Sequence, residues 1–339
     1  STVHLEAGRI VLAAAAGERN RVVVTPAPPG GTLISDAAGL RPTGSGCAAV
    51  NATSVRCLAQ GRLEAHLGDR DDSFDASAYS GPVQVTGGPG ADTITGGSGA
   101  DELRGDLDRQ SAQGGADRLT GNGGDDAIYG GAGNDVIAGG AGDDVMGGAQ
   151  GRDVEDGGPG DDQLDDFGID GDPTAAPAGA DTLRGGPGRD EIHAVTRGDR
   201  VSAGPGDNDV VAVSDSGEDN RSSQVVDCGA GRDEVEVGSR DDVTDCERPV
   251  FERLCSPGPR CQVHWVVTAG RRVVGRGSTH RLLGLRLSCP IALNAAGRRL
   301  ARRPGGVTLG VSTQLRSGRT LFAPRPAISG LRVRLRSPG

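Results

Sequence analysis

The stretch GGAGNDVIAGGAGDDVMGG, residues 130–148, decides the fold: it repeats a glycine pair every nine residues and an aspartate four positions after each pair. Glycine loses more backbone entropy on folding than any other residue, and closely spaced aspartates repel one another at neutral pH. A chain that keeps both features in a fixed frame needs glycine's unusual backbone angles, and it needs something that offsets the negative charge.

The same unit continues on both sides of this stretch. Self-comparison gives the pattern GGxGxDxUx, where U is apolar, with units that start at residues 87, 96, 112, 121, 130, 139, 148, 157, 176, 185, 194, 203 and 228. Glu155 breaks the apolar series, which otherwise contains Ile94, Leu103, Leu119, Ile128, Ile137, Met146, Leu164, Leu183, Ile192, Val201, Val210 and Val235. Three inserts keep the frame intact and are predicted to be loops: 105–111, 166–175 and 212–227. A disordered glycine-rich linker is the alternative, but a linker does not hold such a pattern.

Units such as GGAGNDVIA, GGPGADTIT and GGPGDDQLD resemble the calcium-binding nonapeptides of RTX proteins. The resemblance covers about residues 67–247 and implies a parallel β-roll, in which the first six residues of a unit form a turn and the last three form a strand. It also implies several Ca²⁺ ions held between turns by carboxylates and carbonyls. The predicted metal ligands are the aspartates at the sixth position: Asp92, Asp101, Asp117, Asp126, Asp135, Asp144, Asp153, Asp162, Asp181, Asp190, Asp199 and Asp233, with Asn208 substituting once.

Since two units complete one coil in this family, aspartates 18 residues apart should lie on the same side. This predicts two uninterrupted ladders, one of Asp117, Asp135 and Asp153 and one of Asp126, Asp144 and Asp162. Asp92 and Asp101 join them only if the first insert loops out, and Asp181 and Asp199 should form a shorter pair. One buried apolar side chain per unit does not offset the entropy lost by nine ordered residues, so calcium is predicted to drive folding.

The flanking regions predict an all-β protein of three domains. Residues 1–66 are expected to form an N-terminal β cap region, 67–247 the roll, and 248–339 a small antiparallel β-domain. The segments RIVLAAA, RNRVVVT and GTLISD are typical of short strands between turns. In the C-terminal region, GGVTLGVSTQL and SGLRVRLRS alternate apolar and polar residues, as exposed strands do.

The cysteines favour disulfides in an oxidising compartment over a zinc site, because no CxxC spacing occurs. Cys47 is predicted to pair with Cys57, and Cys228 with Cys246, while the pairing of Cys255, Cys261 and Cys289 stays open. No segment reaches the 18 apolar residues typical of a membrane helix. The expected location is therefore extracellular, and an exported chain would have lost its signal peptide before Ser1.

Charge is divided sharply along the chain. Residues 248–339 hold 18 Arg against Glu252 alone, a net charge of +17, whereas residues 1–247 carry a net charge of −27. The basic tail predicts docking to an anionic cell-surface polymer or to the acidic roll, and a solvated arginine surface is the alternative. Nucleic acid is not expected as a partner, because aromatic stacking residues are nearly absent. All 36 basic residues are Arg, which is typical of a high-GC bacterial coding sequence.

No catalytic motif accompanies the repeats. A P-loop needs a lysine, which the sequence lacks, and neither HExxH nor GxSxG occurs. The tripeptide RGD at 197–199 is explained by the position of Asp199 in the repeat frame. The predicted function is that of a calcium-binding structural or surface-interaction protein and not an enzyme. The alternative is an accessory part or remnant of a secreted RTX-type hydrolase.

Overall fold

The computed structural model consists of strands and turns, and no helix occurs in its described part. The structure describes residues 1–59, 61–106, 114–166, 179–194, 198–212, 224–231, 233–237, 242–244, 248–251, 261–269, 272–281, 307–317, 320–321 and 332–333. Two compact units divide the chain, Ser1–Pro187 and Gly188–Gly339. Membrane-spanning helices are absent from the described residues.

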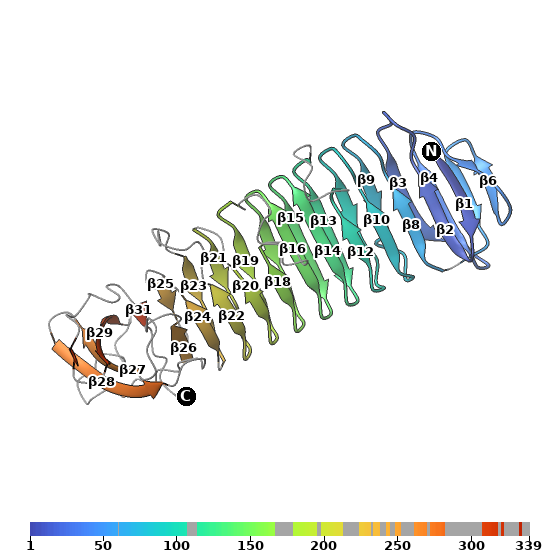
Figure 1. The fold of residues 1–339 in the computed structure, drawn as a ribbon. Coiled ribbons are helices and arrows are strands. Elements are labelled where there is room, and N and C mark those ends of the chain that lie inside the picture. Colours follow the sequence, from blue (N-terminus) through green and yellow to red (C-terminus); the bar gives the residue numbers. More distant parts are fainter. Residues whose placement is uncertain are drawn as a thin grey trace. The chain divides into compact units, whose positions relative to one another are not determined.

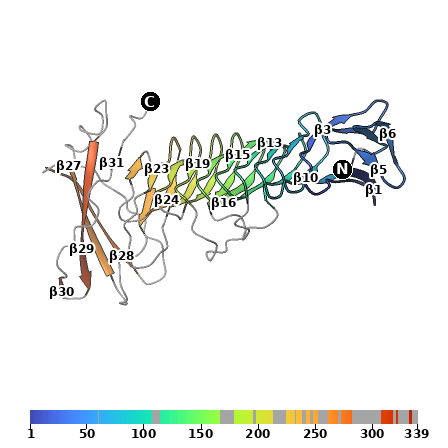
Figure 2. The same cartoon turned by 90° about the horizontal axis from the view of Figure 1, so that it is seen from above.

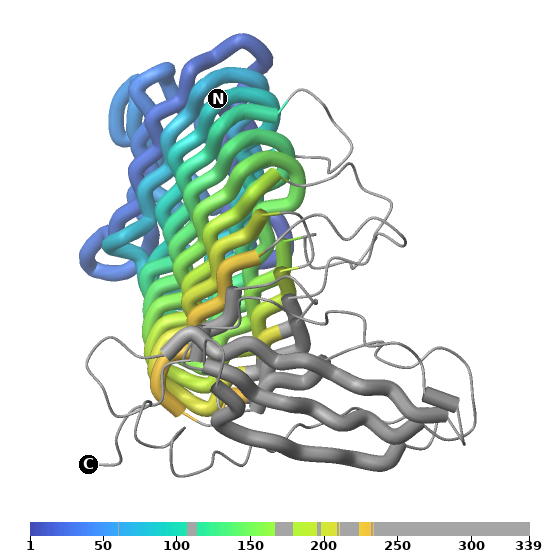
Figure 3. The backbone as a smooth tube through the Cα atoms, turned by 90° about the vertical axis from the view of Figure 1, so that its left-hand side faces the viewer, coloured from blue at the N-terminus to red at the C-terminus, as the bar shows by residue number. Residues whose placement is uncertain are grey.

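In the first unit the repeats form two parallel sheets, and successive strands belong alternately to one sheet and the other (Figure 1). One sheet contains, in order, β8 (Leu63–His66), β10 (Val83–Thr86), β12 (Glu102–Arg104), β14 (Ala127–Ala132), β16 (Val145–Gln150) and β18 (Gln163–Asp165). The other contains β9 (Ser73–Asp75), β11 (Thr93–Thr95), β13 (Arg118–Gly123), β15 (Val136–Ala141), β17 (Val154–Asp156) and β19 (Thr182–Arg184). Two successive strands thus complete one coil of a roll, and the coils stack along its axis (Figures 2 and 3).

The core of the roll is a single file of apolar side chains along each sheet. Leu103 of β12 lies opposite Ile128 of β14, which lies opposite Met146 of β16. All three side chains are fully buried, while the residues beside them in each strand point outward, as the two-residue period of a strand requires. The predicted inward position of the apolar residues is confirmed for those that the structure describes.

The N-terminal region supplies the first coil and closes it. Strands β2 (Arg9–Ala13) and β3 (Arg21–Pro26) pair in parallel with β8 and β9. Antiparallel partners then cover the open end, with β1 beside β2, β4 beside β3, and β7 beside β4. The bounds of the remaining strands are β1 (Thr2–Glu6), β4 (Thr32–Asp36), β5 (Arg41–Pro42), β6 (Cys47–Asn51) and β7 (Ser54–Cys57).

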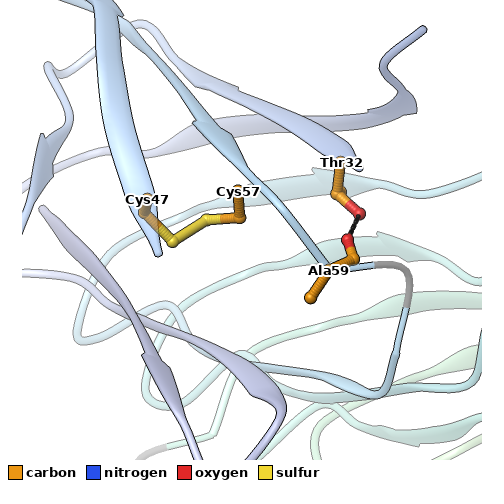
Figure 4. The surroundings of a disulfide bond; sticks show 4 residues. All are labelled: Thr32, Cys47, Cys57 and Ala59. Atoms are coloured by element: carbon orange, nitrogen blue, oxygen red, sulfur yellow. Dashed lines mark hydrogen bonds between the residues drawn. A yellow bond between two sulfur atoms is a disulfide. The ribbon is translucent and has the colours of Figure 1, made fainter. Parts of the chain in front are cut away.

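A disulfide joins the last two strands of this region. Cys47 and Cys57 lie opposite each other in the antiparallel pair β6 and β7, and their sulfur atoms are bonded (Figure 4). On the other edge of β7, the Thr32 hydroxyl donates to the Ala59 carbonyl at 2.7 Å (Figure 4). The predicted disulfide-closed hairpin is confirmed.

The second unit contains parallel strands of the same coil geometry and an antiparallel sheet. Its parallel strands are β20 (Glu191–His193), β22 (Asp209–Ala212), β24 (Glu234–Val237) and β26 (Arg248–Phe251) in one sheet and β21 (Arg200–Ser202), β23 (Val225–Asp227) and β25 (Asp242–Thr244) in the other. The antiparallel sheet contains β27 (Cys261–Ala269), β28 (Arg272–Arg281), β29 (Val307–Ser317), β30 (Thr320–Leu321) and β31 (Arg332–Val333).

The fold class predicted from the sequence, an all-β parallel β-roll with flanking β regions, is confirmed. The boundaries predicted after residues 66 and 247 stay predictions. Cys228 is buried and disulfide-bonded, whereas its predicted partner Cys246 lies outside the described residues. Of the three arginines in the predicted strand SGLRVRLRS, Arg332 lies in β31, and Arg334 and Arg336 lie outside the described residues.

Candidate metal centre

Each repeat aspartate stands directly before a strand, at the end of a turn that glycine makes possible. In the unit that ends in β16, Gly140 and Gly142 have φ angles of 120° and 136°, which residues with a side chain rarely adopt. A Cβ at Gly142 would also collide with the carbonyl oxygen of Gly124 in the preceding coil. Glycine at these positions therefore lets the turns of neighbouring coils stack in contact.

Backbone hydrogen bonds fix the aspartates in a ladder along the first sheet. The N–H of Asp126 donates to Oδ1 of Asp144 at 2.9 Å, and the N–H of Asp144 donates to Oδ1 of Asp162 at 2.9 Å. The same bond links the N–H of Asp101 to Asp126 Oδ1 at 2.8 Å, across 25 residues. The repeat register thus continues past the first insert, and Asp101 joins the ladder, as expected if this insert loops out.

A second ladder runs along the other sheet of the first unit. Its backbone N–H to Oδ1 bonds measure between 2.7 and 2.8 Å and connect, in order, Asp72, Asp92, Asp117, Asp135, Asp153 and Asp181. The predicted central members are therefore adjacent, and Asp92 and Asp181 join them. In the second unit, the N–H of Asp190 donates to Asn208 Oδ1 at 2.9 Å, and the N–H of Asn208 donates to Asp233 Oδ1 at 3.1 Å.

In six of the repeat aspartates the other carboxylate oxygen has no hydrogen-bond donor, whereas Asp101 Oδ2 accepts the Gly97 N–H at 2.6 Å. Oδ2 is buried and without a hydrogen-bond partner in Asp92, Asp117, Asp126, Asp135, Asp144 and Asp153. In the Asp126 turn, this atom and the Gly139 carbonyl oxygen of the next coil occupy the space where a Cβ of Gly121 would stand, both within 3.0 Å of it. Two acceptors, the aspartate Oδ2 and the carbonyl oxygen, thus meet beside the glycine, and we call this space the cradle of the turn. The arrangement is unfavourable unless a positive charge or a hydrogen-bond donor lies between the two oxygens.

Amide side chains at the same position show what the cradle requires. Asn20 takes the place of the aspartate in the first coil, and its Nδ2 donates to the Leu67 carbonyl of the next coil at 2.8 Å. Asn208 likewise donates from Nδ2 to the Gly204 carbonyl at 3.2 Å. Gln224 donates to the Ala194 carbonyl at 2.7 Å and lies 3.4 Å from Asp199 Oδ2. Where the side chain carries an N–H donor, the cradle is satisfied within the protein, whereas the six aspartates without a donor to Oδ2 leave it with oxygens only.

Burial makes the charged form of these carboxylates costly. It raises the pKa of Asp92 and Asp135 to about 8 and that of Asp117 and Asp126 to about 7. Hydrogen bonds from the neighbouring backbone act in the opposite direction, and the charges of adjacent ladder aspartates raise the pKa of Asp135 further. Without a cation, the folded turns therefore retain protons at a pH where exposed aspartates have lost them.

The donor set fits a hard cation such as calcium. It consists of carboxylate and carbonyl oxygens, the ligands that Ca²⁺ prefers. A cation there would reverse the sign of the carboxylate interaction.

The structure places all the predicted ligands in buried positions: Asp92, Asp101, Asp117, Asp126, Asp135, Asp144, Asp153, Asp162, Asp181, Asp190, Asp199 and Asp233. Sequence reasoning missed Asn20 and Gln224 as sixth-position residues and did not align Asp72 with the ladder. Only the alternation of apolar residues in RVVVT could have indicated Asn20, because a long excursion separates it from Asp72.

Comparison with known protein families agrees with this geometry. The family model described as RTX calcium-binding nonapeptide repeat (4 copies) matches residues 84–109, 111–146, 120–155, 133–164 and 178–194. No curated protein matches the chain. The matched segments contain the repeat aspartates from Asp92 to Asp190.

Proposed function

We propose that this chain, which contains RTX calcium-binding nonapeptide repeats, is an extracellular protein whose roll folds when Ca²⁺ fills the cradles between its coils. The observation that carries the proposal is the contrast between Asn20, which donates into its cradle, and six repeat aspartates whose buried Oδ2 atoms have no donor: Asp92, Asp117, Asp126, Asp135, Asp144 and Asp153. Metal binding is then coupled to folding, since the cradle exists only when adjacent coils are stacked.

Calcium is the ion of choice on chemical grounds. It accepts about six to eight oxygen ligands in irregular geometry, which suits carbonyls and carboxylates contributed by two stacked turns. Magnesium requires a nearly ideal octahedron and retains water, which a cradle closed by Gly121 and Gly139 leaves little room for. The repeat aspartates are the proposed ligands, each held by one oxygen to the preceding coil and offering the other to the ion.

A calcium titration of the full chain tests this function. Far-ultraviolet circular dichroism should show β-structure increasing with calcium, and magnesium at the same concentrations should have a much weaker effect. The β-signal should return to its starting value when a chelator is added. A chain that is fully folded in excess chelator would overturn calcium-coupled folding.

Extracellular location is supported by the Cys47–Cys57 disulfide, because disulfides persist in oxidising compartments. Calcium-binding modules outside the cell also work at higher free calcium than the cytosol offers. Fractionation of the producing cells should find the protein outside the cytoplasm with Cys47 and Cys57 oxidised. Finding it in the cytosol with both thiols free would contradict this location.

The surface role is proposed for the basic C-terminal region, whose net charge of +17 favours an anionic polymer. The full chain with calcium should bind heparin at low salt and elute as salt screens the charges. A variant with Arg332, Arg334 and Arg336 changed to Ser should elute at lower salt. Turnover of esterase or protease substrates by the calcium-loaded chain would instead favour the hydrolase alternative.

A further inference from the structure

One residue of the roll's core is a carboxylic acid. Glu155 occupies the apolar position of β17, opposite Ile137 of β15 on one side and Leu183 of β19 on the other. Its side chain is fully buried, with 0% exposed. An unpaired charge in such a place is costly, so the file of apolar side chains is interrupted here for a chemical reason or at a considerable cost to stability.

The Glu155 carboxylate points to the turn and not only into the core. Its Oε1 accepts a hydrogen bond from the N–H of Gly148 at 2.9 Å. Gly148 is the cradle glycine of the Asp153 turn, where a Cβ would collide with Asp153 Oδ2. Glu155 therefore reaches the same cradle as Asp153, and its Oε2 is buried there without a hydrogen-bond partner.

The next coil places further acidic side chains beside the Asp153 turn. We call this turn, with the side chains around it, the Asp153 rung. Asp166 stands where the repeat has its cradle glycine, and its side chain is buried. A carboxylate oxygen of Asp166 lies within 4.8 Å of one from Asp181, which accepts the N–H of Asp153 at 2.7 Å. Glu155 thus shares the Gly148 cradle with Asp153, whose N–H is bonded to Asp181. Asp181 in turn lies beside Asp166.

An ordinary rung is less acidic. At Asp126 the cradle holds one carboxylate oxygen and the Gly139 carbonyl, and the apolar position beside it is Ile128. The Asp153 rung has two further carboxylates. Glu155 stands at the apolar position of the repeat, and Asp166 stands at the position of the cradle glycine. Because ligand charge sets calcium affinity in oxygen sites, this rung differs from the others in the property that matters most for a cation.

We propose that Glu155 and Asp166, together with Asp153 and Asp181, form a cation site of a second kind, which binds Ca²⁺ more tightly than the repeat cradles and favours trivalent lanthanides over Ca²⁺ more strongly. This inference rests on the proposed function, since the rung forms only when the roll is folded. Filling this site first would hold β17 and β19 together and give the remaining coils a place from which to stack.

The full chain and two isosteric variants test the site. Glu155→Gln removes the buried charge and keeps the shape, and Asp156→Asn makes the same change at the next residue of β17, whose side chain is exposed. Calcium binding is measured by competition with a chromophoric chelator, terbium binding by directly excited luminescence, and folding by circular dichroism.

The wild-type chain should bind one ion more tightly than the rest. Glu155→Gln should lower the affinity for that ion by about tenfold or more, for calcium and for terbium, while Asp156→Asn should leave the affinity unchanged. The calcium-dependent β-signal should persist in both variants. Glu155→Leu, which restores the apolar file, should also lose the tight ion and still fold with calcium.

Two results would overturn the site and leave calcium-coupled folding intact. One is a wild-type chain that folds with calcium but has no ion tighter than the others. The other is a Glu155→Gln or Glu155→Leu variant that binds the ion with wild-type affinity. Glu155 would then be a protonated side chain of the core and not a ligand. A wild-type chain without any calcium-dependent β-signal would overturn the proposed function and this site together.

Discussion

The N-terminal cap, residues 1–66, and the repeats that follow it use the same coil in two different ways. In the cap, Val3, Leu12 and Ile34 are fully buried, antiparallel strands close the open end, and a disulfide joins β6 to β7. In the repeats, most of the described short strands bury one apolar side chain, and most turns bury a carboxylate.

The turns of the two regions differ in one side-chain atom. Nδ2 of Asn20 donates to the Leu67 carbonyl, whereas Oδ2 of Asp126 meets the Gly139 carbonyl with no donor between them. A coil can therefore be completed by an internal hydrogen bond or by an external cation. On the proposed function, the first choice gives a coil that is stable without calcium, and the second gives one whose stability depends on calcium.

Removal of a central ladder aspartate should have the largest effect. Asp144 lies between Asp126 and Asp162 in the ladder, so Asp144→Ala should remove ligands from two ions and divide the cooperative unit. The calcium midpoint of the β-signal should rise by about tenfold or more, equivalent to at least 1.4 kcal/mol.

Two other variants sharpen this comparison. Asp233→Ala should shift the midpoint less, because Asp233 follows Asn208, whose amide already donates to a turn carbonyl. Asp144→Asn should cost less than Asp144→Ala, since it supplies the donor that Asn20 and Asn208 use. Equal midpoints for Asp144→Ala and Asp233→Ala would refute the ladder.

A side chain in the cradle should have the next largest effect. Gly121→Ala places a Cβ against Asp126 Oδ2 and the Gly139 carbonyl, so it should destabilise the calcium-bound roll by about 1 to 3 kcal/mol. Gly123→Ala in the same strand meets only the Ala141 carbonyl at 3.5 Å, an ordinary contact, and serves as the matched control. Urea unfolding in saturating calcium measures both, and similar losses would show that the cradle is not special.

Loss of the Cys47–Cys57 disulfide should affect the cap and leave the repeats unchanged. The bond closes a loop with a sequence separation of 10 residues, which corresponds to about 2 to 3 kcal/mol in the chain-entropy model. Cys47→Ser with Cys57→Ser should lower the unfolding temperature of the cap and leave the calcium midpoint of the roll at its wild-type value. A large change in that midpoint would mean that the two regions are not independent in their use of calcium.

Acid should partly replace calcium in the repeats. The pKa of Asp92 and Asp135 rises from 3.8 to about 8 in the folded chain, so the fold binds protons that the unfolded chain has released. The calcium-free roll is therefore most stable below about pH 4 and loses stability as pH rises towards 8. Circular dichroism in calcium-free buffer should show more β-structure at pH 5 than at pH 8.

The pH trend should reverse when calcium is limiting. Protons and the ion compete for the same carboxylates, so the calcium midpoint should fall as pH rises. A midpoint that does not change between pH 5 and 8 would show that the ladder carboxylates are not the ligands.

The period of nine predicted most of the roll, because each unit repeats the same turn, aspartate and apolar residue. It correctly placed Asp117 beside Asp135 and Asp126 beside Asp144, and it correctly treated the first insert as compatible with the frame. These contacts are local in the coil, so spacing alone determines them.

The first coil could not be predicted in the same way. Asn20 meets Asp72 across 52 residues, because the cap strands are inserted between β3 and β8. The nine-residue spacing cannot predict which residues pair when a segment of this length is inserted. Glu155 was visible as a break in the apolar series, but its link to Gly148 depends on where its side chain turns, which no pattern of residue types specifies.

Hydrogen exchange on the full chain, compared in calcium and in excess chelator, tests the central claim most directly. Peptides from β2, β3 and β7 should exchange slowly in both conditions, because donors inside the protein satisfy these coils. Peptides from β13 to β17 should exchange slowly in calcium and rapidly in chelator, because their cradles hold only oxygens. Equally slow exchange of the β13 to β17 peptides in chelator would contradict the claim that calcium completes the coil.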